Sequence, residues 1–242
     1  MVQGDLNTTS FLVLGLLASR DWSAYEIAEQ VGRGVAEVWP RADRQRYNAP
    51  KRLLERGLVT ARTENTGERR RRTVYSITES GRDALSEWLS TQSRPPALEF
   101  EGLIRVMFAE QGSIEDFRAN LRNLREQASR TQQLFVSHAG RLHAPDGGTF
   151  PERLHLMTLA NKFMIGHFDN MIEWVDWALD ETDCWPDTVS PATTHAARSR
   201  EILAATMTLA RPAGSEPESL EGLRTPDEPI RAASSPSGSQ EG

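Results

Sequence analysis

Residues 58–78, LVTARTENTGERRRRTVYSIT, carry the pattern that most restricts how this chain can fold. Two segments with the composition of β-strands, 58–65 and 73–78, flank a turn-like segment at 66–72, and together they predict a β-hairpin. Four consecutive arginines, Arg69 to Arg72, fall in the predicted turn. The chain as a whole has a formal net charge of −6, so the hairpin concentrates positive charge in an acidic protein.

Three helical segments precede this hairpin and one follows it. The first is apolar over residues 11–17, the second has its apolar face at 25–31, and the third is the basic segment 41–57. The expected capping residues are Asn7, Thr8 or Thr9 for the first helix, Ser23 with Glu26 for the second, and Thr78 for the last. The order helix–helix–helix–strand–strand–helix is that of a winged helix-turn-helix.

Basic side chains gather in the two elements of such a fold that contact DNA. Residues 33–72 hold twelve Lys or Arg against five Asp or Glu. A third helix can enter the major groove, and cations gain affinity from DNA phosphates by displacing counterions. We therefore expect Arg44, Gln45 and Asn48 to face bases, and Tyr47, Lys51, Arg52, Arg69, Arg70, Arg71 and Arg72 to face the backbone. The alternative for such a charge run is a solvated helix face.

Residues 8–90 resemble the N-terminal domain of PadR-like transcriptional regulators. The resemblance is carried by VLGLL, YEI, LLERGLV and RTVYSIT followed by glycine. Ala24 stands where the family often has glycine, and Pro50 stands where it often has a helix-compatible residue. Because proline lacks a backbone N–H and clashes with the preceding turn, the third helix is expected to kink or restart at Ala49–Pro50.

The resemblance implies a mainly α-helical protein with an α+β winged-helix head and a helical C-terminal dimerisation region. It also implies a dimeric repressor that binds double-stranded DNA and is released by a small molecule or a stress signal. A pseudo-palindromic operator would match the two-fold symmetry of a dimer. A winged-helix module that binds an acidic partner protein is the alternative function.

The composition suggests where these parts begin and end. We expect a winged-helix domain at 1–92, a proline hinge at 93–97, and a helical dimerisation and effector domain at 98–182. Within it, 139–149 is predicted to be a loop, and the longest helix is predicted from Thr149 to about residue 180. Residues 183–242 are predicted to be a mostly disordered tail with a possible helix at 193–210.

Apolar residues at helical spacing suggest a partner chain for the helical domain. A seam with steps of three and four runs through the first long helix, and a broad stripe runs along the second. Two long amphipathic helices need more cover than one small core supplies, so we expect a homodimer. The residues expected to form its interface are Phe117, Leu121, Leu124, Phe135, Met164, Phe168, Met171 and Val175.

The second stripe also suggests a ligand site. Methionine and tryptophan side chains line adaptable pockets, so a small aromatic effector could bind among them. The candidate residues are Met164, Phe168, Met171, Trp174 and Trp177, and the alternative for the same stripe is dimer core.

The sequence gives no sign of an enzyme, a cofactor or a metal centre. It contains no Walker loop, GxGxxG, HExxH or GxSxG motif, and its five histidines are scattered. The single cysteine, Cys184, has no basic neighbour in the sequence and excludes an internal disulfide framework, which suits the cytoplasm. No apolar run approaches the length of a membrane span.

Overall fold

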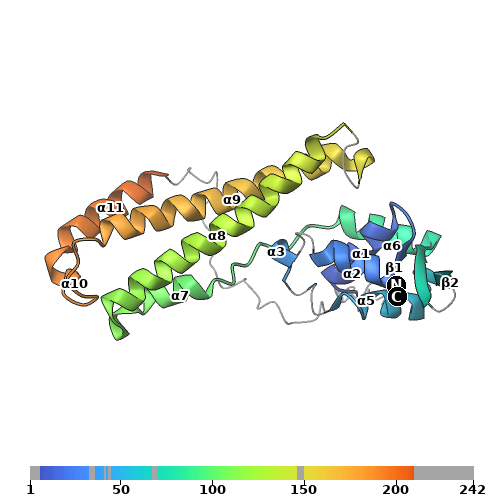
Figure 1. Cartoon of the computed structure of the whole chain (residues 1–242), viewed down its shortest axis with the longest axis horizontal. Coiled ribbons are helices and arrows are strands. Elements are labelled where there is room, and N and C mark those ends of the chain that lie inside the picture. Colours follow the sequence, from blue (N-terminus) through green and yellow to red (C-terminus); the bar gives the residue numbers. More distant parts are fainter. Residues whose placement is uncertain are drawn as a thin grey trace, which may run out of the picture. The chain divides into compact units, whose positions relative to one another are not determined.

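The computed structural model describes residues 6–209, apart from 33–35, 41, 43–44, 67–69 and 146–149. The described residues divide into two compact units. The first ends at Arg94 and is called the head below. The second begins at Pro95 and is called the helical unit (Figure 1).

Two capped helices begin the head. Helix α1, Thr8–Leu17, is capped by Asn7, whose side-chain oxygen accepts a hydrogen bond from the backbone N–H of Ser10. Helix α2, Ala24–Gln30, starts with a complete capping box between Ser23 and Glu26. Both starts were predicted from local sequence, because a cap depends on residues three positions apart. The apolar side of α1 forms much of the core of the head, with Phe11, Val13, Leu14 and Leu17 buried.

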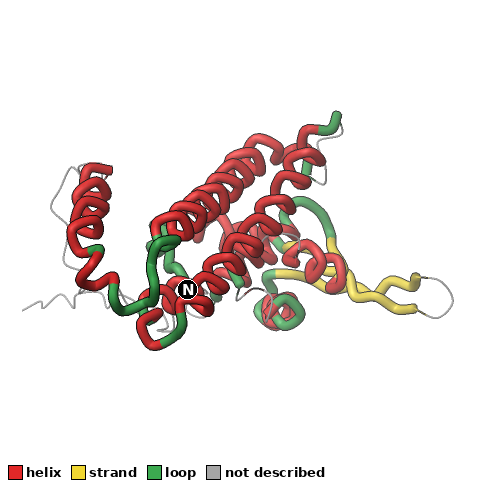
Figure 2. Tube along the Cα trace, turned by 60° about the vertical axis from the view of Figure 1, so that its left-hand side comes forward, coloured by secondary structure: helices red, strands yellow, loops and turns green. Residues whose placement is uncertain are grey.

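A three-stranded antiparallel sheet completes the winged fold. Its strands are β1, Trp22–Ser23, β2, Val59–Thr66, and β3, Arg70–Ile77, in the order β1-β3-β2. The β2–β3 hairpin projects from the helices of the head as a long ribbon (Figure 2). The prediction of a turn over 66–72 was wrong in its extent, because Arg70, Arg71 and Arg72 pair with Thr66, Asn65 and Glu64 inside the ladder. Strand β1 was not predicted, since two residues carry no periodicity.

Helix α6, Glu79–Ser90, packs tightly onto the base of the hairpin. Thr78 caps it as predicted, and the Thr78 hydroxyl also donates to the carbonyl of Gly57 at 2.9 Å. Gly57 ends the preceding helix with a φ of 69°, a backbone conformation that favours glycine. A Cβ added at Gly81 would lie 2.1 Å from the carbonyl oxygen of Leu58, so no side chain fits there. The helix ends at Ser90, before the predicted proline hinge at 93–97.

Two long helices dominate the helical unit. After α7, Glu101–Met107, and a 3-10 turn at Ala109–Gln111, α8 runs over Ile114–His143, and α9 runs over Leu154–Glu181 after a 3-10 turn at Pro151–Arg153. The two long helices lie side by side (Figures 1 and 2). Their cross-contacts, Arg125 with Asp176 and Phe135 with Phe168, show that they are antiparallel.

The boundaries of these helices differ from those predicted. The loop expected at 139–149 starts later, because α8 continues to His143. The predicted cap, Thr149, lies outside the described residues, and α9 begins at Leu154. The longest described helix is therefore α8, with 30 residues, and not α9, with 28.

The segment after α9 is ordered through residue 209. It holds α10, Pro191–Thr194, and α11, Ala196–Leu209, where a disordered tail with a possible helix at 193–210 was predicted. Arg118 of α8 holds the start of this segment by donating to the carbonyl oxygens of Thr182, Asp183 and Trp185 at 2.6, 2.9 and 3.2 Å. The prediction underestimated this segment because its contacts come from α8, far away in sequence.

None of the helices that the structure describes has the length and apolar character of a membrane span.

Candidate nucleic-acid interface

The C-terminal part of the segment expected to be a third helix forms a separate short helix, α5. Between α3, Ala36–Val38, and α5, Ala49–Glu55, the described residues Ala42 and Gln45 are helical, and residues 46–48 form a turn that leads into α5. Pro50 lies in the first turn of α5 and is fully buried. The restart at Ala49–Pro50 that the sequence suggested is thus present, because the first turn of a helix tolerates the missing N–H of proline.

Helix α5 presents a polar and basic side to solvent. Ala49, Pro50 and Leu53 are buried, so the intervening positions face outward. Tyr47, Asn48, Lys51 and Arg52 are all exposed, as a surface that contacts DNA requires. The guanidinium of Arg46 lies 5.2 Å from the centre of the Tyr47 ring and holds positive charge beside it. This surface contains four of the residues that the sequence assigned to DNA contact.

The other predicted base-contacting residues are placed differently. The side-chain oxygen of Gln45 accepts a hydrogen bond from the Asn7 amide at 2.6 Å, and Gln45 is half-buried. Arg44 lies outside the described residues. Asn48 is thus the exposed member of the predicted base-facing set among the described positions.

The hairpin carries a network of arginines and carboxylates. Arg62 of β2 bonds to Asp21 at 2.5 Å and to Glu64 at 3.0 Å, and Arg72 of β3 bonds to Glu64 at 2.8 Å. Hydrogen bonds from Arg72 and Arg62 lower the pKa of the Glu64 carboxyl, and a hydrogen bond from Arg62 does most to lower the pKa of Asp21. These carboxylates therefore stay ionised and offset part of the positive charge of the hairpin.

Arg71 differs from its neighbours in this network. Its side chain is exposed and forms no ion pair with another described residue. Arg69 lies outside the described residues, and of Arg70 the backbone alone is described, in β3. Arg62 was missed by the sequence analysis, because its place on the hairpin surface depends on the register of β2 against β3.

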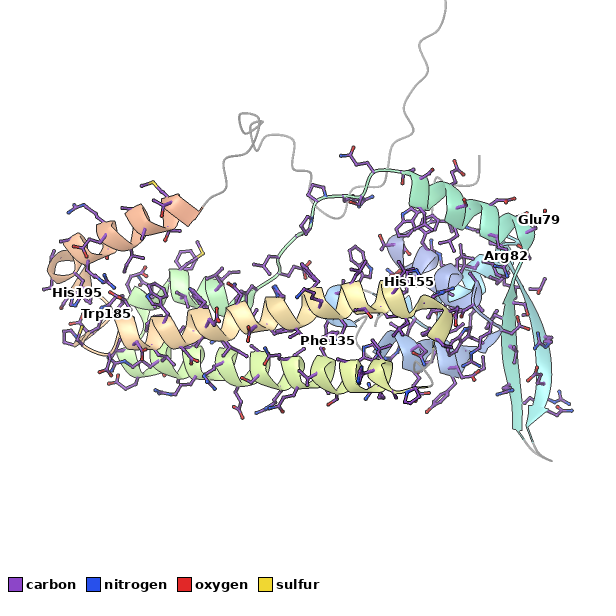
Figure 3. All side chains as sticks on the ribbon, turned by 90° about the horizontal axis from the view of Figure 1, so that it is seen from above. Glu79, Arg82, Phe135, His155, Trp185 and His195 are labelled. Atoms are coloured by element: carbon purple, nitrogen blue, oxygen red, sulfur yellow. The ribbon has the colours of Figure 1, made fainter. Side chains whose placement is uncertain are left out.

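The residues assigned to the dimer interface lie in the core of one chain. Phe117, Leu121 and Leu124 of α8 form one buried cluster with Val175 of α9. Phe135 lies between the two long helices (Figure 3), and its ring stacks on that of Phe168 with centroids 6.1 Å apart. Met164 is buried, and Met171 is half-buried. The apolar seam was identified correctly, but the assignment to a partner chain is corrected, because α9 of the same chain covers it.

The candidate effector residues do not form one pocket. Phe168 stacks on Phe135 of α8, whereas Trp174 and Trp177 line an open groove of about 380 Å³ between α9 and α11 that Met164 and Met171 do not line. The wall supplied by α11 consists of Arg198, Glu201, Ile202, Ala205 and Thr206. Arg198 also pairs with Glu181 at 3.0 Å. The predicted five-residue pocket is therefore corrected to a groove that contains two of those residues.

Cys184 has a basic neighbour that its sequence context did not indicate. Its sulfur lies 3.3 Å from Nε2 of His195, and Nδ1 of His195 lies 2.9 Å from the Thr194 hydroxyl. Trp185 and His195 lie together near the end of α9 (Figure 3), with ring centroids 6.1 Å apart. Among the described residues, no three His, Cys, Asp or Glu side chains are placed to hold a metal ion.

Comparison with known proteins agrees with this fold. The model of the transcriptional regulator PadR-like family matches residues 13–87. The negative transcriptional regulator PadR of Bacillus subtilis (strain 168) is 27% identical over 104 residues, which are 43% of this chain and 57% of that protein. The chain thus matches little more than half the length of this relative.

Solved structures share the architecture over a larger part of the chain. Bacillus subtilis PadR in complex with operator DNA has a TM-score of 0.61 and 22% identity, over 72% of this chain and 99% of that one. The Vibrio cholerae virulence activator AphA has a TM-score of 0.57 and 25% identity, over 73% and 98%. By their names, the curated relative is a negative transcriptional regulator and AphA is a virulence activator. Residues 13–87 of this chain are therefore similar to the transcriptional regulator PadR-like family, and the likeness of fold extends over about 72% of the chain.

Proposed function

We propose that this chain is a DNA-binding transcriptional regulator that acts as a homodimeric repressor. The observation that carries the proposal is the exposed basic surface of Tyr47, Asn48, Lys51 and Arg52, together with Arg71 on the projecting hairpin. These groups stand out in a chain of net charge −6, so attraction to DNA has to be local. The solved complex of Bacillus subtilis PadR with operator DNA supports the same role.

In the proposed complex, α5 approaches the major groove and the hairpin follows the phosphate backbone. Asn48 can donate to and accept from a base edge, whereas Lys51, Arg52 and Arg71 neutralise phosphates. Repression follows if the occupied operator overlaps a promoter. The name of the curated relative, a negative transcriptional regulator, supports repression.

We further propose that a second copy of the chain packs against an exposed apolar stripe on α9. Leu156, Leu159 and Phe163 follow one another at steps of three and four, so they share one side of the helix. Leu159 and Phe163 are 68% and 69% exposed, which is unusual for large apolar residues on one helix face. This stripe is separate from the buried seam that faces α8.

The dimer proposal predicts the effect of charge on this stripe. Leu159→Glu combined with Phe163→Glu should convert the dimer to a monomer. Dimerisation would bury both carboxylates with no cation beside them, and the cost of removing these charges from water would oppose association. Light scattering would measure the mass, and circular dichroism would show whether the helices persist. Leu203→Glu, at an equally exposed apolar position on α11, should leave the dimer unchanged. A double variant that remains a dimer would exclude this surface.

We also propose that a small aromatic molecule releases the protein from DNA by binding in the α9–α11 groove. Trp174 and Trp177 offer ring faces for stacking, and Bacillus subtilis PadR has been solved in complex with p-coumaric acid. Release requires the molecule to bind the DNA-free conformation more tightly than the DNA-bound one.

A selection experiment tests the function as a whole. The purified protein should enrich a two-fold symmetric sequence from a pool of random duplexes, and its affinity should fall steeply with salt. Aromatic carboxylic acids such as p-coumaric acid should then release the selected duplex from the wild-type protein. They should have no such effect on Trp177→Ala. Enrichment of no sequence at low salt would leave the protein-interaction module as the better explanation.

A further inference from the structure

Two side-chain hydrogen bonds tie the start of α1 to the segment that precedes α5. The amide nitrogen of Asn7 donates to Gln45 at 2.6 Å, and the indole nitrogen of Trp39 donates to the hydroxyl of Thr9 at 3.2 Å. Thr9 is buried, and both bonds span at least 30 residues of sequence. They therefore hold Trp39 and Gln45 against the start of the first helix.

Asn7 has two roles at once. Its side-chain oxygen caps α1 by accepting from the backbone N–H and the hydroxyl of Ser10 at 3.0 and 3.1 Å. Its side-chain nitrogen is therefore directed to Gln45. The cap orients the amide, so one residue both starts the helix and holds the segment.

These hydrogen bonds matter because a turn at residues 46–48 separates the helical residue Gln45 from the start of α5. The turn is closed by a hydrogen bond from the backbone N–H of Asn48 to the carbonyl of Gln45 at 2.9 Å, and a similar bond of 2.9 Å joins Ala42 to the carbonyl of Trp39. Pro50 cannot donate to a carbonyl in the preceding turn, which prevents an uninterrupted helix from holding the segment in place. The hydrogen bonds to Asn7 and Thr9 therefore help to hold Gln45 and Trp39 in place.

We propose that Asn7 and Thr9 are positioning residues for DNA recognition, which they serve through Gln45 and Trp39. Gln45 then supports the residues before α5 from inside the head, a role called a strut below, and it does not contact a base. Tyr47 and Asn48, which follow the strut directly, owe their placement to it. The proposal rests on the DNA-binding function proposed above.

The physical consequence is a difference between specific and non-specific binding. Base contacts need side chains held in one geometry, so the apparent affinity falls with the fraction of molecules in which the segment is correctly placed. Contacts to phosphates are less demanding in geometry, and they dominate binding to unrelated DNA. Loss of a strut should therefore lower specificity more than general affinity.

The variant Asn7→Ser separates the two roles of Asn7. Serine caps a helix as well as asparagine does, but its side chain is too short to reach Gln45. Binding to the duplex selected by the wild-type protein should weaken about fivefold, the value of one hydrogen bond. Binding to an unrelated duplex and the salt slope should not change. Thr78→Ser, a conservative change at the cap of α6, is the matched control and should change neither quantity.

A double-mutant cycle then distinguishes a strut from a base contact. If Gln45 is a strut, Gln45→Ala should weaken binding to all single-base variants of the selected duplex equally, and Asn7→Ser should add no further loss. If Gln45 contacts a base, Gln45→Ala will change the preference at one base pair, and the losses of the two variants will add. That second result overturns the proposal. Because Gln45→Ala leaves the α1 cap intact, it decides the question alone if the Asn7 variant does not fold.

The experiment also separates this inference from the proposed function. A wild-type protein that selects no duplex removes both. A wild-type protein that selects a duplex and an Asn7→Ser variant that binds it equally well remove the positioning role alone.

Discussion

Replacing both Lys51 and Arg71 by alanine is expected to weaken binding to the selected duplex by on the order of a hundredfold or more at physiological salt. The two residues lie on different elements, α5 and β3, and both side chains are exposed. A dimer would lose four phosphate contacts, and the slope of log K against log salt should fall by about one for each contact. Electrophoretic mobility shifts or fluorescence anisotropy at several salt concentrations would measure both quantities.

The control for this experiment removes the same charge from the helical unit. Arg105→Ala with Arg130→Ala breaks two exposed ion pairs within single helices, which contribute little to stability. Because this variant has the same net charge, it should bind DNA as the wild type does if the contacts are local. Equal weakening in both variants would mean that net charge, and not the α5 and hairpin surface, determines affinity. An unchanged affinity in the Lys51/Arg71 variant would favour a basic surface that binds an acidic protein.

Leu121→Ala is expected to destabilise the helical unit by about 3 kcal/mol, the middle of the range for a leucine removed from a packed core. Leu121 is 0% exposed and belongs to the same buried cluster as Phe117 and Val175. Leu134→Ala, on the exposed side of the same helix, removes the same atoms from a side chain that is 63% exposed and should cost far less. Urea unfolding followed by circular dichroism would compare the two variants.

The same experiment tests whether the apolar seam of α8 packs against α9 of its own chain or against a second chain. If Leu121 packed against a second chain, alanine would lower the dimerisation constant and the loss of stability would depend on protein concentration. If it packs against α9 of its own chain, as the structure shows, part of the loss remains when the stripe variant Leu159→Glu/Phe163→Glu provides the background. A Leu121→Ala effect that disappears in that background would contradict the intrachain core.

Sequence predicted best the features that depend on neighbouring residues. The caps at Asn7, Ser23 and Thr78 were all identified, because a capping side chain contacts a backbone group within three residues. The helix restart at Pro50 follows from the covalent structure of proline itself. The order of the predicted elements indicated the winged fold, and the family resemblance added the expectation of a helical dimerisation region.

Sequence failed where a side chain has two possible partners of the same chemistry. Leu121 and Val175 have the pattern of a dimer seam, and an apolar stripe fits a helix of its own chain as well as one of a partner. The Arg72–Glu64 pair depends on strand register, and the Cys184–His195 contact depends on the path of the chain after α9. The wall that α11 adds beside Trp177 was missed for the same reason.

The contact at Gly81 affects how α5 and the hairpin can move relative to α6. The carbonyl of Leu58 touches the α6 backbone at Gly81 and also accepts from the Thr78 N–H at 3.1 Å, while Thr78 bonds to Gly57 at the end of α5. These contacts join the start of α6 to the base of the hairpin and to the end of α5, with the backbones in direct contact. A rotation of α6 would therefore carry the hairpin and α5 with it, so the two elements proposed to contact DNA would move together as one body.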